Sequence, residues 1–294
     1  MQMERSRGIV MDEIIIENLK VYAYHGVYQE ETEKGQNFYV NAVLYTDTRT
    51  AGREDKRELV TSYGDVCQFI HKFVSENVYK LIETVAERTA EAVLSEFPLL
   101  EGITLEIRKP EAPIDLEFQS VSVKITRMWH TAALATGSNV GNRPKYIKDA
   151  IEMLDSDEKC SVIKSSELVR SRPYGDVQQE DFFNGAVLLR TLYTPEELLD
   201  KLHEIEDASG RQRVKHWGPR TLDLDIIFYD DLILYTDTLQ IPHQDMQHRD
   251  FVLEPLSQIT PYKIHPVSGK TVIQLYEEVQ KAGEKYVIDS EYIQ

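Results

Sequence analysis

Hydrophobic and polar positions divide the first 127 residues into six elements. Phe38, Val40, Ala42 and Leu44 alternate with more polar neighbours, which is typical of a strand that buries one face. The pattern predicts strands over residues 14–24, 38–45, 103–109 and 121–127, helices over residues 64–77 and 81–97, and a loop over residues 52–58. In the second helix, which Pro98 ends, the buried face is predicted to comprise Leu81, Val85, Thr89 and Val93.

The rest of the chain mixes strands and helices without a regular β-α-β repeat. Pro144 occupies the favoured first-turn position of one helix, and Thr194 with Glu197 forms a capping box at the start of another, which runs to about Ser209. Strands are predicted over residues 131–136, 185–192 and 222–229. This irregular order favours an α+β fold over a doubly wound sheet.

Composition and charge narrow the class of protein. The 294 residues are enough for two domains, each with its own core. A net charge of −17 opposes binding to a phosphate backbone, so we expect no nucleic-acid partner. Two cysteines in no paired spacing and no apolar segment of membrane-spanning length predict a cytoplasmic protein without membrane contact. Met11 directly precedes the first strand, so residues 1–10 are interpreted as an extension, with Met1 and Met11 as alternative starts.

The strongest chemical pattern is a pair of carboxylates in the predicted strand 222–229. Alternation places Leu222, Leu224 and Ile226 on one face and Asp223 and Asp225 on the other, about 7 Å apart. Such a pair could share a divalent cation, and Mg²⁺ is usual where substrate phosphates complete the shell. An exposed polar strand face is an equally good interpretation of the alternation alone.

Other polar residues near this strand favour phosphate chemistry. Residues 211–215 and Arg220 are rich in guanidinium groups, which match phosphate oxygens, although a solvated basic loop is the alternative. Glu206 lies beside the buried stripe of its helix and therefore needs a partner. His243 follows the strand, although a lone histidine is more often structural. The glycine-bearing segment 136–142 lacks the lysine of a phosphate-binding loop and is interpreted as a turn.

The first half carries a weaker signal. Lys109 ends an apolar strand face, where snorkelling to solvent is the favoured interpretation and a pocket lysine the alternative. Glu83 in a first helical turn is explained by the helix dipole, and Glu87 and Glu91 by a solvated helix face. The segment 63–65 could be a turn that caps the preceding helix.

The second half resembles the 6-hydroxymethyl-7,8-dihydropterin pyrophosphokinase family over residues 131–276. The ordered matching segments are residues 135–139, 181–184, 195–199, 206–213, 217–226 and 241–243. The chain departs from the family's frequent pattern at residues 171–173 and at His216. The resemblance implies a ferredoxin-like α+β fold that transfers a pyrophosphoryl group from ATP to the pterin hydroxymethyl group.

The kinase resemblance also implies residue roles. Asp223 and Asp225 would hold two Mg²⁺ ions, with Arg211 and Arg220 acting in catalysis. The expected nucleotide-binding residues are Glu206, Arg213, Trp217, Ile226, His243 and Arg249. The expected pterin-binding residues are Asn184, Phe182, Tyr174 and Phe251.

The first half resembles dihydroneopterin aldolase over residues 14–127. The matching segments are residues 24–27 with Glu31, 35–36, 62–66, 81–87 and 107–110. The resemblance implies the tunnelling fold, in which four subunits complete one barrel and active sites form between neighbours. It implies retro-aldol cleavage of 7,8-dihydroneopterin to glycolaldehyde and 6-hydroxymethyl-7,8-dihydropterin, without a metal or a Schiff base.

The aldolase resemblance assigns a further set of roles. Glu83 would anchor the pterin, with Ile82 beside it, because a carboxylate can pair with the pterin amino group and ring N–H. Lys109 and Tyr63 would transfer protons with a water between them, and Glu31 would bind the side-chain hydroxyls. An epimerase side activity is an alternative that the sequence leaves open.

Together the two resemblances predict a bifunctional enzyme of folate biosynthesis. The expected domains are residues 11–128, the aldolase, and residues 129–294, the pyrophosphokinase, in a homo-oligomer built through the first domain. One alternative is an active kinase on a non-catalytic N-terminal scaffold. Another is a pterin- or nucleotide-binding regulator without turnover, against which the retained Asp223, Asp225, Arg220 and Lys109 argue.

Overall fold

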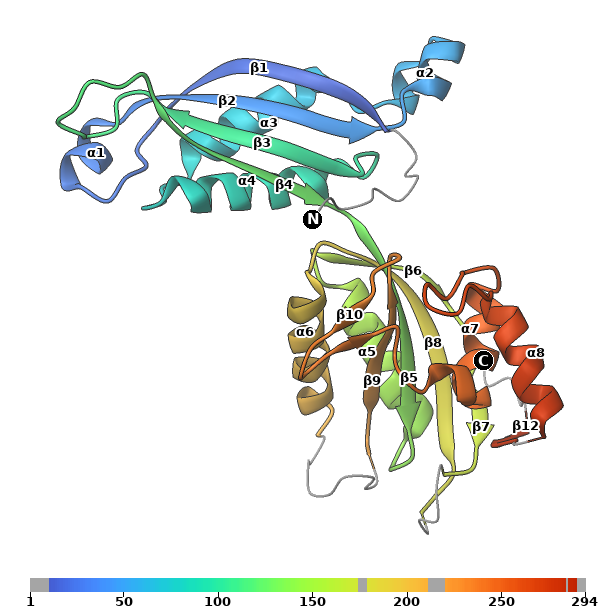
Figure 1. The fold of residues 1–294 in the computed structure, drawn as a ribbon. Coiled ribbons are helices and arrows are strands. Elements are labelled where there is room, and N and C mark those ends of the chain that lie inside the picture. Colours follow the sequence, from blue (N-terminus) through green and yellow to red (C-terminus); the bar gives the residue numbers. More distant parts are fainter. Residues whose placement is uncertain (1–10, 174–178, 211–219, 284, 290–294) are drawn as a thin grey trace. The chain divides into compact units, whose positions relative to one another are not determined.

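The computed structural model describes residues 11–173, 179–210, 220–283 and 285–289. The chain divides into two compact units, Met1–Trp129 and His130–Gln294, and each is described by itself. Figure 1 shows the sheet and helices of each unit. No helix within the described ranges is both long enough and apolar enough to cross a membrane.

The first unit is a four-stranded antiparallel sheet with two helices on one face (Figure 1). Its strands follow the order β1 (Asp12–Ala23), β2 (Gln36–Thr46), β3 (Gly102–Lys109) and β4 (Val121–Met128). The helices are α3 (Tyr63–Glu76) and α4 (Ile82–Glu96). Short helices α1 (Gln29–Lys34) and α2 (Arg49–Glu54) follow the first two strands.

The core of this unit lies between the sheet and the two helices, where the alternation on β2 predicted it. Phe38, Val40, Ala42 and Leu44 are all buried. Val85, Thr89 and Val93 on α4 are buried as predicted, but the prediction for Leu81 was wrong. Leu81 is the residue before the first turn of α4 and is 51% exposed. A residue outside the helix does not share its buried face.

The loop predicted over residues 52–58 was partly wrong. Helix α2 extends to Glu54, and a 3-10 turn, η1, covers Arg57–Leu59. Charged residues suit an exposed helix as well as a loop, because arginine and glutamate are good helix formers. Asp55 ends α2 in a left-handed conformation, with φ of 53°.

The second unit is a sheet covered by helices on both faces (Figure 1). Its strand order is β12-β7-β8-β5-β9, with β6 also pairing with β8, and all of these pairings are antiparallel. The strands are β5 (His130–Ser138), β6 (Cys160–Ser165), β7 (Val169–Ser171), β8 (Phe182–Thr191), β9 (Asp223–Tyr229) and β12 (Val287–Asp289). A separate hairpin consists of β10 (Leu234–Tyr235) and β11 (Gln240–Ile241).

Alternate residues of the central strands face two separate cores. Ala132 and Leu134 of β5 pack with α5 (Arg143–Asp155) and α6 (Pro195–Ala208). Ala133 of β5 packs with α7 (Asp250–Ile259) and α8 (Val272–Ala282). A short 3-10 turn, η2 (Met246–His248), precedes α7. The predicted α+β class is confirmed, while β6, β7, β12, α7 and α8 were not predicted.

Candidate active sites in the two units

A cavity of about 290 Å³ opens at the end of the second unit's sheet where β9 begins. It combines carboxylates, cationic groups and aromatic rings. Its lining includes Asp223, Asp225, Arg220, Phe182, Asn184, His243, Arg249 and Phe251, which are eight of the predicted site residues. Residues that the sequence did not assign also line it: Ala135, Thr136, Gly137, Ser171, Arg172, Gln179, Gln244, Asp245 and Val252.

The two aspartates face this cavity because β9 alternates as predicted. Leu222, Leu224 and Ile226 are buried in the core on the opposite side. The Arg220 guanidinium forms an ion pair with Asp223. Burial, together with the charges of Asp223 and Glu206, raises the pKa of Asp225 to about 7. The interpretation of an exposed polar strand face is therefore wrong.

The aspartate pair fits a divalent cation. Two carboxylates in a cavity repel each other, and a cation would relieve both that repulsion and the raised pKa of Asp225. The described residues contain no group of three or more His, Cys, Asp or Glu side chains arranged to hold a metal ion. Mg²⁺ commonly binds one or two carboxylates and fills its shell with water and phosphate oxygens, so this donor set suits it.

Glu206 and Ile226 have no side chain in the cavity. Glu206 is buried on α6, where its Oε1 accepts a hydrogen bond of 2.8 Å from the Leu224 N–H. It thus supports β9 from behind the aspartates. The Ile226 side chain belongs to the core, so only its backbone could contact a ligand.

The segment predicted to be a simple turn over residues 136–142 instead supports the cavity. β5 continues to Ser138, whose Oγ donates to the Thr221 carbonyl at 2.6 Å. Asn139 forms hydrogen bonds with both backbone groups of Arg220. Its Oδ1 accepts from the Arg220 N–H at 2.7 Å, and its own N–H donates to the Arg220 carbonyl at 3.0 Å. The sequence signal was the Gly-Ser-Asn run itself, whose amide and hydroxyl partners lie about 80 residues away.

Asn184 and the two phenylalanines occupy the part of the cavity nearest β7. The Asn184 Nδ2 donates to the Ser171 Oγ at 2.8 Å. A side chain at Gly137 would place its Cβ 3.3 Å from the Asn184 Oδ1, so glycine keeps this floor open. Phe182 and Phe251 supply ring surface beside the amide.

His243 and Arg249 lie on the remaining wall. Burial and the charge of Arg249 lower the pKa of His243, so the imidazole is neutral at pH 7. The Arg249 Nη2 donates to Asp245 at 2.8 Å. Tyr174, Arg211, Arg213 and Trp217, the remaining predicted residues, lie outside the described ranges.

In the first unit, Lys109 is a buried residue and does not snorkel to solvent. Its ammonium group forms an ion pair with Glu31, and its Nζ lies 6.0 Å from the centre of the Phe38 ring. Gln36 Nε2 donates to the same carboxylate at 3.4 Å. The snorkelling interpretation was therefore wrong, because a carboxylate 78 residues away in the chain reaches the buried Lys109.

Glu31 is fixed by local structure as well as by Lys109. Its Oε2 accepts from the Tyr28 N–H at 3.1 Å at the start of α1. Burial alone would raise the pKa of Glu31, but the hydrogen bonds from Lys109 and the Tyr28 N–H and the charge of Lys109 outweigh it and lower the pKa. A Cβ at Gly26 would lie 2.3 Å from Oε2, so only glycine admits the carboxylate here.

Tyr63, Ile82 and Glu83 lie at helix starts. Tyr63 begins α3 after the N-cap Ser62 and is 66% exposed, so the helix-ending turn interpretation was wrong. Glu83 is exposed in the first turn of α4, and Ile82 is half-buried beside it. Within the described part of the first unit, no hydrogen bond or ion pair joins Tyr63 or Glu83 to Lys109.

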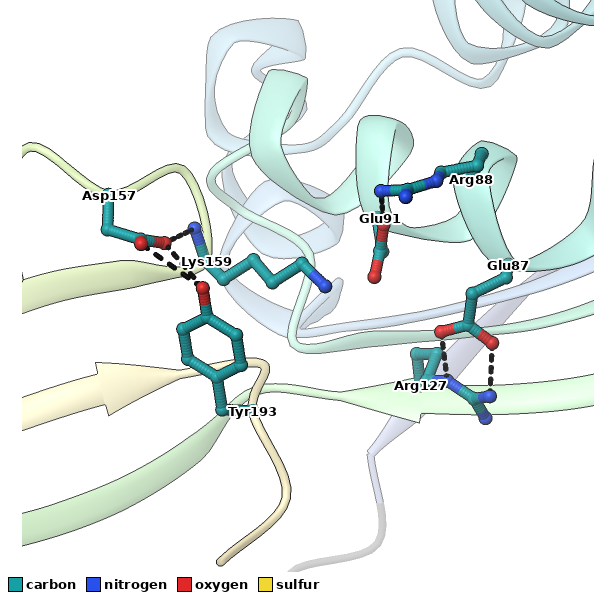
Figure 2. Close-up of polar contacts among 7 residues, drawn as sticks. All are labelled: Glu87, Arg88, Glu91, Arg127, Asp157, Lys159 and Tyr193. Atoms are coloured by element: carbon teal, nitrogen blue, oxygen red, sulfur yellow. Dashed lines mark hydrogen bonds and ion pairs between the residues drawn. The ribbon is translucent and has the colours of Figure 1, made fainter. Parts of the chain in front are cut away.

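Glu87 and Glu91 do not form a simple solvated face. Figure 2 shows the Arg127 guanidinium paired with both oxygens of Glu87, and Arg88 paired with Glu91 at 3.2 Å. In the second unit the same figure shows Asp157 accepting from the Tyr193 hydroxyl at 3.1 Å and the Lys159 N–H at 2.9 Å. The α4 pairing was missed because Arg127 lies 40 residues from Glu87.

Two family models match the chain, one in each unit. Residues 14–126 match dihydroneopterin aldolase, and residues 133–261 match 7,8-dihydro-6-hydroxymethylpterin-pyrophosphokinase. A 2-amino-4-hydroxy-6-hydroxymethyldihydropteridine pyrophosphokinase of Synechocystis is 46% identical over 150 residues, covering 51% of this chain and 76% of that protein.

Longer relatives match both units. A folic acid synthesis protein fol1 of Pneumocystis carinii is 31% identical over 294 residues, covering 94% of this chain and 39% of that protein. The chain thus spans about two fifths of this relative's length. The E. coli dihydroneopterin aldolase in complex with neopterin is 30% identical over 40% of this chain and 99% of its own, with a TM-score of 0.37. The chain belongs to the 7,8-dihydro-6-hydroxymethylpterin-pyrophosphokinase family through its second unit and carries a dihydroneopterin aldolase domain in its first.

Proposed function

We propose that the chain catalyses two consecutive steps of folate biosynthesis. Residues 11–128 cleave 7,8-dihydroneopterin, and residues 129–294 pyrophosphorylate the 6-hydroxymethyl-7,8-dihydropterin that results. The observation that carries the proposal is the cavity that Asp223, Asp225, Asn184 and Phe182 line together in the second unit; in the first unit, Lys109 is buried against Glu31. A non-catalytic scaffold would not need that buried pair.

The proposed kinase step transfers the β,γ-pyrophosphoryl group of ATP. The hydroxymethyl oxygen attacks the β-phosphorus and its proton passes to solvent, while the bond from that phosphorus to the oxygen of the α-phosphate breaks and AMP leaves. Asp223 and Asp225 would hold two Mg²⁺ ions, which when bound offset the charge of the phosphates. Arg220 and Arg249 line the cavity, and their guanidinium groups would bind phosphate oxygens there.

Other cavity residues would orient the substrates. The Asn184 amide offers a hydrogen bond to the pterin edge, and Phe182 and Phe251 offer ring faces to the pterin. Neutral His243 can hydrogen-bond the nucleotide without adding charge. Four further residues lie outside the described ranges. As their family positions suggest, we assign Arg211 to catalysis, Arg213 and Trp217 to nucleotide binding, and Tyr174 to pterin binding.

The proposed aldolase step breaks the bond between the first and second carbons of the dihydroneopterin side chain. The hydroxyl of the second carbon loses its proton and becomes the aldehyde of glycolaldehyde. The electron pair of the broken bond enters the pterin ring system, and the first carbon then takes up a proton to give the hydroxymethyl group. Lys109 and Tyr63 would move these protons through a water, while Glu31 binds side-chain hydroxyls.

We further propose that this site is completed in a homo-oligomer. Tyr63 and Glu83 lie exposed at helix starts, and within the described part of one chain no hydrogen bond or ion pair joins either of them to Lys109. A neighbouring first unit that supplied one of them would complete the set. The net charge of −17 supports a small-molecule enzyme without a nucleic-acid partner, and we place it in the cytoplasm.

One reaction tests both proposed activities. Purified protein is incubated with 7,8-dihydroneopterin, ATP and Mg²⁺, and the products are resolved by mass spectrometry over time. We expect glycolaldehyde, AMP and pyrophosphorylated hydroxymethyl-dihydropterin. Conversion of added hydroxymethyl-dihydropterin alone would favour the scaffold alternative for the first unit. An absence of AMP formation with either substrate would contradict the kinase proposal.

A further inference from the structure

A buried carboxylate lies directly behind the cavity wall of the second unit and has no role in the steps above. Asp250 is the first residue of α7 and is fully closed to solvent. Its two chain neighbours, Arg249 and Phe251, both line the cavity. Burying a carboxylate is costly unless hydrogen bonds satisfy it, so its partners indicate what it does.

The partners of Asp250 are backbone N–H groups from the next residue of its own helix and from one distant segment. Its Oδ1 accepts from the Phe251 N–H at 2.8 Å. Its Oδ2 accepts from the N–H groups of Tyr286 and Val287, at 2.8 Å and 3.0 Å. These residues lead into β12, so a carboxylate at the start of α7 holds a strand 36 residues further along the chain. Its position at a helix N-terminus also favours the negative charge.

Strand β12 connects Asp250 to residues that line the cavity. Val287 pairs with Ser171 on β7, and the Arg172 N–H donates to the Tyr286 carbonyl at 2.9 Å. Ser171 and Arg172 line the cavity, and the Ser171 Oγ holds the Asn184 amide at 2.8 Å. The backbone of β12 therefore links Asp250 to the expected pterin-binding amide.

A ring contact makes a second link to the same wall. The Phe251 ring meets the Tyr286 ring edge to face, with centroids 6.1 Å apart and planes at 85°. Asp250 thus accepts a hydrogen bond from the Phe251 N–H, and it also accepts one from the N–H of Tyr286, whose ring contacts the Phe251 ring. The Asn184 amide and the Phe251 ring are thus both connected to the Asp250 carboxylate by these contacts.

We propose that Asp250 is a positioning residue for pterin recognition, acting through β12 on Ser171 and Phe251. The inference rests on the proposed pyrophosphokinase function of this cavity. An asparagine of the same shape would have one acceptor oxygen, and its NH₂ group would face backbone N–H donors. Asp250→Asn should therefore loosen the pterin wall while the aspartate pair and Arg220 stay in place.

Steady-state kinetics of the full-length chain test the proposal. In Asp250→Asn we expect the KM for 6-hydroxymethyl-7,8-dihydropterin to rise about tenfold or more, with kcat and the KM for ATP changed less than about threefold. A merely structural role would lower the active fraction, and hence kcat, at an unchanged KM. Asp231→Asn is the matched control, because Asp231 is an exposed carboxylate that pairs with Lys263; its KM values should match the wild type.

A double-mutant cycle tests the route through β12. Val287→Pro removes one N–H that Asp250 binds and should raise the pterin KM on its own. If the route is correct, Asp250→Asn adds little further effect in the Val287→Pro background. Fully additive effects, or a pterin KM unchanged in Val287→Pro, would overturn it.

The positioning role and the proposed function fail in different ways. A wild-type chain that turns over, with an unchanged pterin KM in Asp250→Asn, contradicts the positioning role alone. A wild-type chain without pyrophosphoryl transfer contradicts the proposed reaction. The same variants are then compared by fluorescence titration with hydroxymethyl-dihydropterin in the presence of α,β-methylene ATP. Unchanged pterin affinity in Asp250→Asn overturns the positioning role, and a loss of about tenfold or more supports it.

Discussion

The Lys109 ammonium and the Glu31 carboxylate form an ion pair that is almost closed to solvent. Their side chains are 10% and 6% exposed and come from β3 and α1. Two charges withdrawn from water are tolerated when they satisfy each other, and a single one is not. Lys109 therefore favours the ionised form of Glu31, and each side chain holds the other in place.

Removing Lys109 should separate the two proposed activities. We expect Lys109→Met to abolish glycolaldehyde release, because the proton-transfer group is lost while the apolar stem is kept. Pyrophosphoryl transfer to added hydroxymethyl-dihydropterin should be unchanged, since that cavity lies in the other unit. Both products are followed by mass spectrometry. Retained glycolaldehyde release would contradict the role of Lys109.

The same substitution should also destabilise the first unit. Lys109→Met leaves Glu31 buried without its cation, at a cost of about 3–5 kcal/mol in the free energy of unfolding. The double variant Lys109→Met with Glu31→Gln should recover part of this loss, because no uncompensated charge remains. Urea unfolding followed by circular dichroism measures both. A double variant less stable than the single one would show that the pair is not coupled in this way.

A third prediction concerns the pH dependence of stability without metal. The pKa of Asp225 is raised to about 7 in the folded chain from an ordinary value near 3.8. The folded state therefore binds more protons than the unfolded state between about pH 4 and 7, and this group's ionisation lowers stability as pH rises through that window. Asp225→Asn should raise the melting temperature of the metal-free chain at pH 8 more than at pH 5, while abolishing ATP-dependent turnover.

The control for this prediction is Asp230→Asn. Burial would raise the pKa of Asp230, but hydrogen bonds from His130 and the Thr131 N–H lower it, so its ionised form is favoured in the folded state. Asp230→Asn should lower the melting temperature more at pH 8 than at pH 3. If Asp225→Asn changed the melting temperature of the metal-free chain equally at pH 5 and pH 8, the raised pKa of Asp225 would be contradicted.

Binding of Mg²⁺ should release protons near pH 7. A cation favours the ionised form of Asp225, so the proton that the metal-free site holds in part must leave. Isothermal titration of the wild-type chain with MgCl₂ and α,β-methylene ATP, in two buffers with different ionisation enthalpies, measures this release. We expect a fraction of one proton at pH 7 and little at pH 9. A buffer-independent heat at pH 7 would contradict it.

Gly26 gives a steric prediction with a matched control. Gly26→Ala would put a methyl group 2.3 Å from the Glu31 Oε2, which forces the carboxylate away from Lys109. We expect a loss of about 1–3 kcal/mol in stability and of most aldolase activity. Gly52→Ala on α2 meets nothing within 4 Å and should be neutral or slightly stabilising. An active, stable Gly26→Ala protein would show that the carboxylate can move.

The parts of the fold that follow from local patterns could be predicted from the sequence. The alternation on β2 and β9 placed Leu44 and Leu224 in the cores and Asp223 and Asp225 on the opposite face. The capping box of Thr194 and Glu197 placed the start of α6. In each case the burial of a side chain or the start of a helix is determined by residues nearby in sequence, so periodicity and capping residues are enough to predict it.

The parts that depend on distant partners could not be predicted. Lys109 was expected to snorkel because nothing beside it in sequence shows that Glu31 arrives from α1. The three-residue strands β7 and β12 are defined by pairing with distant strands, β7 with β8 and β12 with β7, and neither shows a period of its own. Asp250 belongs to the same class, because its role appears only when residues 286 and 287 reach it.

The alternation on β9 makes the chain tolerant of one kind of mutation and intolerant of another. Leu224 and Ile226 belong to a core, and Asp223 and Asp225 line the cavity, and all four occupy alternate places on one short strand. A substitution can change one face and spare the other. A single-residue insertion or deletion between Leu222 and Ile226 would exchange the faces, sending carboxylates into the core and leucines into the cavity. We therefore expect natural variants of this strand to differ in side chains but not in length, because a shift of one residue would remove the stability and the chemistry together.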